Sequence, residues 1–247
     1  MTGAVSSPRV LVVEHAGECP PALLGTWLVE AGCALEVSRP WAGEELRALA
    51  SYDALVVLGG PMGADDDALY PWLTTVKERV REAAAAELPT LGICLGHQLA
   101  AVALGGEVRR NPRGQQMGVL EVGWQEDAAE DGLLGGMVDA RRGVQWNNDV
   151  VTALPEGTTV LARTPEGELQ VARFAPTVWG VQLHPEADRP VVEAWADSDR
   201  GSHEALGIDQ EALLVGIDGA RAELDEAWRP LATRLAALAT GFAERRR

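Results

Sequence analysis

Residues 90–98 read TLGICLGHQ, and at Cys94 the pattern of a strand changes into the pattern of a helix. Residues 90–93 form a short apolar run typical of a buried parallel strand, and residues 95–104 have helical spacing. A residue on such a turn projects from the carboxyl edge of a sheet, and the glycines on both sides permit close backbone approach. The helix N-terminus also favours a thiolate. We therefore predict that Cys94 is a nucleophile; the alternative is a buried, inert cysteine.

Upstream of this turn, strand and helix patterns alternate. Strands are predicted over residues 9–13, 35–37 and 54–58, and helices over residues 20–32, 44–50 and 70–86. This alternation predicts an α/β fold of the flavodoxin-like kind, with a doubly wound, mostly parallel sheet and flanking helices.

Downstream, the pattern changes to short extended runs at residues 119–122, 143–146, 159–163, 169–174 and 178–183. We predict mixed or antiparallel strands that extend the sheet. Residues 188–247 are helical by pattern, and Pro230 inside the apolar stripe allows two helices or one kinked helix. The predicted domains are therefore residues 1–187 and a C-terminal helical extension, residues 188–247, which we expect to pack on the first.

A nucleophilic cysteine needs a base, and His184-Pro185-Glu186 follows the last predicted strand. This loop places the imidazole of His184 at the same sheet edge as Cys94, where Glu186 can orient it and stabilise its protonated form. His15 also ends a strand but lacks such a carboxylate-bearing loop. His97 is expected to be packed or exposed, and His203 to lie in a polar tail segment.

Composition narrows the partners and the compartment. The net charge is −16, so nucleic-acid binding is not expected. No apolar run is long enough to cross a membrane, and residues 1–10 lack a secretion pattern. Three cysteines fit a reducing compartment, so we predict a cytoplasmic protein. Asp65-Asp66-Asp67 is expected to be a solvated turn or helix cap, and no metal or cofactor is predicted.

Together, Gly92-Ile93-Cys94-Leu95-Gly96-His97-Gln98 and His184-Pro185-Glu186 resemble the motifs of the class I, or triad, glutamine amidotransferases. More narrowly, the chain looks like free-standing members related to the glutaminase domain of GMP synthase, over roughly residues 9–187. The resemblance implies that Cys94, His184 and Glu186 cleave the side-chain amide of glutamine.

The same resemblance implies further site residues. It includes Gly59-Gly60-Pro61, and it implies that the N–H groups of Gly60 and Leu95 hold the oxyanion. Gln98 matches the glutamine that contacts the substrate amide, and Gly59 is expected to lie at the substrate as well.

One stretch departs from the family pattern. Many relatives have Trp-His-x-Asp or Ser-His-x-Asp ahead of the triad histidine, and this chain reads Trp146-Asn147-Asn148-Asp149. In the family this segment lies beside the α-amino and α-carboxyl groups of the substrate, so Asn147 and Asn148 are candidate substrate-binding residues. The alternative is that they are ordinary turn formers.

Three functions stay open on these residues. The chain could hydrolyse glutamine and release ammonia to a separate synthetase partner. It could instead be a stand-alone hydrolase of γ-glutamyl amines, or a catalytically silent binding module. A homodimer also stays open, as do the acceptor of the ammonia and the role of the C-terminal helices.

Overall fold

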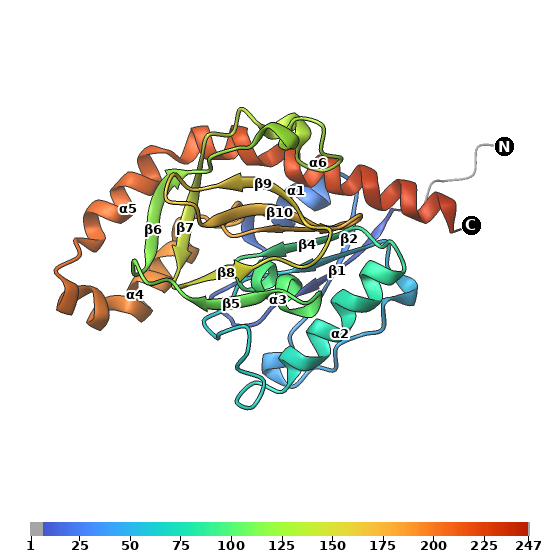
Figure 1. Cartoon of the computed structure of the whole chain (residues 1–247), viewed down its shortest axis with the longest axis horizontal. Coiled ribbons are helices and arrows are strands. Elements are labelled where there is room, and N and C mark those ends of the chain that lie inside the picture. Colours follow the sequence, from blue (N-terminus) through green and yellow to red (C-terminus); the bar gives the residue numbers. More distant parts are fainter. Residues whose placement is uncertain (1–6, 247) are drawn as a thin grey trace.

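The computed structural model describes residues 7–246 and is built on a seven-stranded sheet of order β2-β1-β3-β4-β11-β10-β9 (Figure 1). The parallel strands are β1 (Arg9–Val13), β2 (Ala34–Ser38), β3 (Ala54–Val57), β4 (Thr90–Ile93) and β11 (Val178–Val181). The antiparallel strands are β10 (Leu169–Ala175) and β9 (Thr159–Arg163). The doubly wound α/β fold predicted from the sequence is confirmed.

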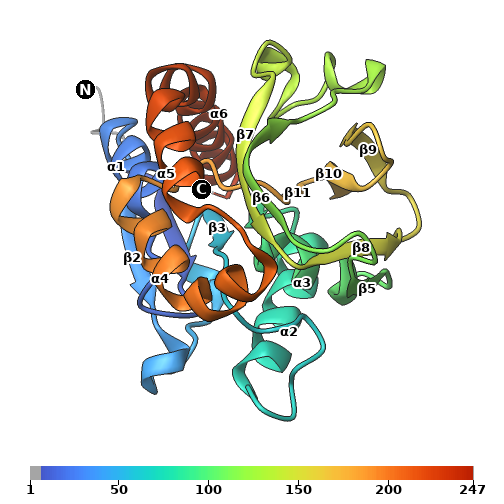
Figure 2. The ribbon, with the colours of Figure 1, turned by 90° about the vertical axis from the view of Figure 1, so that its left-hand side faces the viewer.

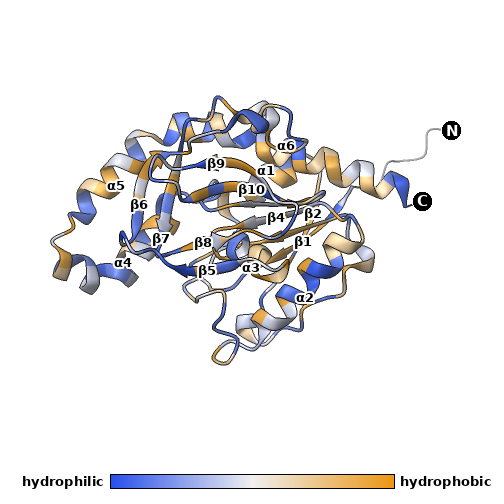
Figure 3. Cartoon of the chain, in the orientation of Figure 1, coloured by the Kyte–Doolittle hydropathy of each residue, from blue (hydrophilic) through white to orange (hydrophobic). Residues whose placement is uncertain are grey.

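Helices cover both faces of this sheet (Figure 2). Side chains alternate along β1, so Val10 and Val12 belong to one core cluster and Leu11 and Val13 to the other. The first cluster includes residues of α1 (Ala22–Glu30) and α6 (Arg221–Arg245), and the second those of α2 (Trp72–Ala85) and α3 (Leu95–Ala103). In Figure 3 the hydrophobic residues accordingly gather on the central strands.

Two of the predicted extensions of the sheet form a separate ribbon instead. β6 (Gln116–Glu121) pairs with β7 (Arg142–Asn147) in an antiparallel two-stranded sheet, because these runs hydrogen-bond along their full length to each other. A second ribbon joins β5 (Glu107–Arg110) to β8 (Asp149–Ala153), neither of which was predicted. The runs at residues 159–163, 169–174 and 178–183 do belong to the main sheet, as expected.

The helix predicted over residues 44–50 is wrong. This segment is mostly irregular and lies between the short 3-10 turns η1 (Pro40–Ala42) and η2 (Leu49–Ser51). Only Leu46 is buried within it, so it has no apolar face to hold a helix on the core. Two further 3-10 turns, η3 (Glu126–Ala128) and η4 (Gly135–Met137), follow β6.

The C-terminal segment consists of α4 (Arg189–Leu206), α5 (Gln210–Gly219) and α6, which continues through Pro230 as one helix. Trp228 and Leu231 of α6 are almost fully buried in the same cluster as Val10. The division at residue 187 stays a prediction, and the helices beyond it share the core of the sheet. Among the described residues, no helix is long and apolar enough to span a membrane. Residues 1–6 of the segment examined for a secretion pattern lie outside the described part.

Candidate active site

Cys94 occupies a constrained turn between β4 and α3. Its backbone has φ 48° and ψ −102°, a conformation that residues other than glycine rarely adopt. A Cβ atom on Gly92 would overlap the backbone of Gly96, and one on Gly96 would overlap the carbonyl oxygen of Val57. The flanking glycines are therefore required for the close approach of α3 to the sheet, which holds the thiol at the carboxyl edge.

His184 reaches the same edge because β11 lies beside β4. Val181 pairs with Ile93, and the N–H of Cys94 donates to the carbonyl of Val181 at 2.8 Å. Three residues later, the N–H of His184 donates to the carbonyl of Val144 on β7 at 2.7 Å. A Cβ atom on Gly59 would lie 3.1 Å from Cε1 of His184 and 3.6 Å from Cβ of Cys94, so the two side chains are close neighbours.

The imidazole of His184 is held from one side by a carboxylate. Its Nδ1 lies 2.7 Å from Oε1 of Glu186, and both side chains are about 3% exposed. Its Nε2 is buried and has no hydrogen-bond partner among the described residues. Glu186 therefore fixes the tautomer with the proton on Nδ1 in the neutral ring, and leaves Nε2 for the thiol or a substrate.

Opposing effects set the charge of His184. Burial lowers its pKa, but the charges of Glu186 and Cys94 and the hydrogen bond to Glu186 outweigh burial and raise the pKa from 6.5 to about 10. The raised pKa favours the protonated, cationic ring. A cationic imidazole beside a cysteine stabilises the thiolate, the form of cysteine that attacks carbonyl carbon.

Gln182 is a contact of Cys94 that the sequence reasoning missed. Its Nε2 lies 3.5 Å from Sγ of Cys94, and its Oε1 accepts a hydrogen bond from Nε2 of Gln98 at 3.3 Å. Gln98 also donates to the carbonyl of Asp149 at 3.0 Å. Its position in the sequence could have indicated this contact. Gln182 lies two residues before His184, so an extended chain presents both side chains on one side.

The predicted oxyanion donors lie next to each other. A Cβ atom on Gly60 would lie 3.0 Å from Cδ2 of Leu95, and Leu95 is the first residue of α3. Within residues 7–246, neither the N–H of Gly60 nor that of Leu95 has an acceptor in the protein. Two free N–H groups beside a thiol are what a tetrahedral oxyanion needs.

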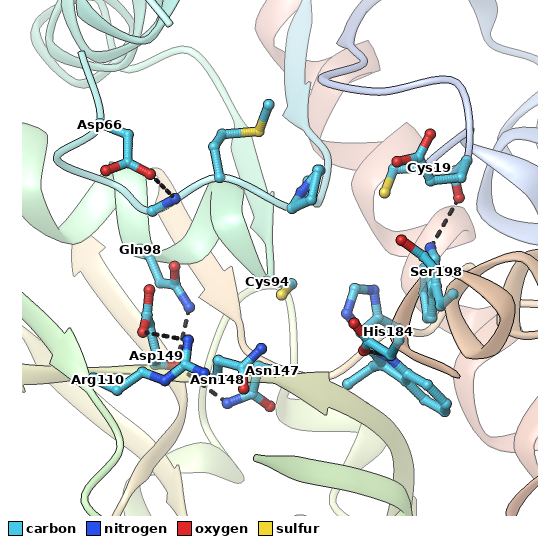
Figure 4. Close-up of a pocket in the computed structure, with 18 residues that line it drawn as sticks. Cys19, Asp66, Cys94, Gln98, Arg110, Asn147, Asn148, Asp149, His184 and Ser198 are labelled. Carbon is cyan, nitrogen blue, oxygen red and sulfur yellow. Dashed lines mark hydrogen bonds and ion pairs between the residues drawn. The ribbon is translucent and has the colours of Figure 1, made fainter. Parts of the chain in front are cut away.

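A cavity of about 360 Å³ opens over Cys94. Among the residues predicted from the sequence, it is lined by Gly60, Cys94, Gln98, Asn147, Asn148 and His184. Glu186, Gly59 and Leu95 are not in its wall. In Figure 4, Cys94 lies between two flanks: Asp66, Gln98, Arg110 and Asp149 on one side, and Cys19, His184 and Ser198 on the other.

Asn147 and Asn148 have different surroundings. Nδ2 of Asn147 donates to Oε1 of Gln116 and to the carbonyl of Asp149, both at 3.1 Å. Its Oδ1 is buried with no partner among the described residues. The carbonyl of Asn148 accepts from the N–H of Asn111 where the chain passes from β7 to β8. Asn147 therefore offers a free acceptor, and Asn148 makes the connection between two strands.

The largest omission of the sequence analysis was the wall formed by α4. Trp195, Ser198 and Asp199 of this helix line the cavity, and the ring centroid of Trp195 lies 4.4 Å from that of His184. Glu18 and Trp146 complete this flank. These residues come from segments far apart in the sequence, so no local pattern connects them with Cys94.

The other histidines are structural. His15 accepts from Nε1 of Trp72 at 3.3 Å, and burial lowers its pKa to about 3. His97 is fully buried against Phe174. The placement of His203 in a polar tail was wrong, since it is fully buried in α4 and contacts the ring of Trp146, which removes it from water.

Two of the three adjacent aspartates pair within the protein. Oδ2 of Asp66 accepts from the N–H of Gly63 at 2.7 Å, and Asp67 forms an ion pair with Lys77 at 2.5 Å. The part of the chain that the structure describes contains no group of three or more His, Cys, Asp or Glu side chains arranged to hold a metal ion.

Comparison with known proteins yields one family. The family model "Glutamine amidotransferase class-I" matches residues 23–191. A GMP synthase (glutamine-hydrolyzing) from Aeropyrum pernix is 34% identical over 79% of this chain, and the match spans 37% of the relative's own length. The gamma-glutamyl peptidase 5 of Arabidopsis thaliana is 28% identical over 58% of this chain and 57% of its own length.

A solved structure gives the same result. The crystal structure of a glutamine amidotransferase from Thermotoga maritima has a TM-score of 0.82 and 27% sequence identity, and the alignment covers 93% of this chain and 98% of that one. The similarity extends beyond the segment that the family model matches, so it includes the C-terminal helices.

Proposed function

Since this chain belongs to the class I glutamine amidotransferase family, we propose that it hydrolyses γ-glutamyl amides through a Cys94 thioester. The observation that carries the proposal is the alignment of three groups at one sheet edge. Cys94 lies on its strained turn, His184 has a free Nε2, and Glu186 is bonded to the other nitrogen of the ring.

In the proposed reaction the thiolate of Cys94 attacks the side-chain carbonyl carbon of the substrate. The N–H groups of Gly60 and Leu95 hold the oxyanion, each worth roughly a hundredfold to a thousandfold in rate. The cationic ring of His184 gives a proton to the departing nitrogen as the C–N bond breaks, leaving a thioester. The neutral ring then takes a proton from water, which attacks the thioester and releases glutamate.

Two substrates fit this chemistry. With glutamine the leaving group is ammonia, which would pass to a separate synthetase chain; the similarity to a glutamine-hydrolyzing GMP synthase supports that option. With a γ-glutamyl amine the leaving group is the amine. This second candidate is supported by the cavity, which continues past His184 along α4. We expect the cytoplasm as the compartment, since all three described cysteines are free thiols. A homodimer is compatible with either substrate.

The test is glutamate release from glutamine and from γ-glutamyl amines, by wild type and by Cys94→Ala. The proposal requires turnover of at least one substrate that is lost in Cys94→Ala. Turnover that survives this substitution would remove the thioester from the mechanism. If no substrate is turned over and a glutamine-mimicking electrophile does not label Cys94, the chain is a catalytically silent binding module.

A further inference from the structure

The two flanks of the cavity differ in charge. Among the described residues, Arg110 is the only Lys or Arg side chain that lines it, and Figure 4 places this residue with Asp66, Gln98 and Asp149. The opposite flank, which we call the α4 flank, consists of Glu18, Cys19, Trp146, Trp195, Ser198 and Asp199. It contains two carboxylates and two indole rings, without a cationic side chain of Lys or Arg.

The carboxylates of the α4 flank form no ion pair with a Lys or Arg side chain within residues 7–246, and their only ion-pair contact there is with Nε2 of His203, 3.8 Å from Oδ2 of Asp199. The side chain of Glu18 makes no hydrogen bond or ion pair to any described residue, although its carbonyl accepts from Nε1 of Trp195 at 2.9 Å. Oδ2 of Asp199 accepts from Nε1 of Trp146 at 2.9 Å and from Nε2 of Gln115 at 3.0 Å. These bonds hold the carboxylate in place and leave Oδ1 of Asp199 without a partner among residues 7–246.

The proposed mechanism fixes which part of a substrate meets this flank. His184 gives its proton to the departing nitrogen, so that nitrogen and anything attached to it lie on the His184 side of Cys94. The ring of His184 packs on Trp195, whose centroid lies 4.4 Å away. The amine half of an amide therefore extends along α4, and the glutamyl carboxylate is left to Arg110 on the other flank.

We propose that the α4 flank is a subsite for the amine half of the substrate, and that it selects an amine bearing a second, positively charged nitrogen. Carboxylates beside indole rings favour ammonium groups through ion pairing and cation–π contact. Ammonia leaves this subsite empty, and an anionic amine half would face Glu18 and Asp199. The inference rests on the proposed γ-glutamyl amide hydrolysis.

The experiment compares three γ-glutamyl amides of matched length, made from 1,4-diaminobutane (cationic), pentylamine (neutral) and 4-aminobutyrate (anionic). We expect kcat/KM to be about tenfold higher for the cationic amide than for the neutral one, and lowest for the anionic one. Asp199→Asn and Glu18→Gln should each lower the cationic-to-neutral ratio about three- to fivefold. Asp197→Asn is the matched control, because Asp197 lies on the same helix, pairs with Arg200 and points to solvent; its ratio should equal that of wild type.

Equal rates for the three amides, or a ratio that neither substitution in the α4 flank changes, would overturn the subsite while leaving the hydrolase intact. If no amide is hydrolysed, the proposed function fails. The subsite is then tested by calorimetric measurement of the binding of the three amides to Cys94→Ala. Tightest binding of the cationic amide, weakened by Asp199→Asn, supports it. Absent or equal binding overturns it.

Discussion

Glu186→Gln tests how the charge of His184 is maintained. The substitution keeps the shape of the side chain and removes the carboxylate that lies 2.7 Å from Nδ1. The pKa of His184 is about 10 because the charges of Glu186 and Cys94 overcome burial. One close opposite charge typically changes a pKa by 1 to 3 units. We expect the pKa of His184 to fall by roughly 1.5 units, which corresponds to about 2 kcal/mol.

The assay is the pH dependence of Cys94 alkylation by iodoacetamide, followed by intact mass. A fall of roughly 1.5 units from about 10 leaves the ring cationic at pH 7, so we expect Glu186→Gln and wild type to be alkylated at similar rates there. The alkaline transition of the alkylation profile, where the ring loses its proton, should lie about 1.5 pH units lower in Glu186→Gln. Glu193→Gln is the control, since Glu193 is an exposed partner of Arg189 on α4. Alkylation within twofold of wild type at every pH would refute the coupling of Glu186 to the thiolate.

Three further predictions concern the turn, the missed amide and acid stability. Gly96→Ala should destabilise the protein by about 3 kcal/mol in urea unfolding, because the new Cβ meets the carbonyl of Val57, whereas Gly216→Ala in open space on α5 should stabilise it by up to about 1 kcal/mol. Gln182→Leu should lower kcat about tenfold with KM little changed, because Cys94 loses a donor; an unchanged kcat would make Gln182 purely structural. Burial lowers the pKa of His97 to about 4, so its neutral form contributes stability that is complete above pH 6.5 and is lost as pH falls toward 4. Between pH 7 and pH 5 this loss is about 2 kcal/mol, and buried His15 adds a loss of the same sign. In urea unfolding at the two pH values, His97→Gln should therefore reduce the pH dependence by about 2 kcal/mol relative to wild type.

The sheet and the strand-to-helix turn could be predicted because their information is local. The central parallel strands β1 and β3 are short apolar runs, and the glycines beside Cys94 mark a turn that other residues cannot form. His184 and Glu186 lie in one tripeptide. Their positions at the sheet edge follow from the order of β4 and β11.

The features that the sequence did not predict correctly have a different origin, because they are set by contacts between segments that are distant in the sequence. The sequences of β6 and β7 have the same strand pattern as those of the main sheet. Only their hydrogen-bond pairing with each other places them in a separate two-stranded sheet. His203 lies in a polar stretch of sequence, and it is buried because the ring of Trp146, on β7, packs against it. The α4 flank brings Trp146, which lies in the segment already singled out, next to residues of the first loop and of a C-terminal helix that have no distinctive local pattern.

The dependence of the cavity on α4 also sets the order in which a growing chain acquires its parts. The residues of the nucleophilic turn have all been synthesised by residue 98, but the base is at residue 184 and the far wall reaches residue 199. Trp228 of α6 then donates from Nε1 to the carbonyl of Arg142, at the start of the strand whose later residue Trp146 anchors Asp199. A nascent chain thus holds its thiol without a base until His184 has been synthesised, and the α4 wall of the cavity is added after the base.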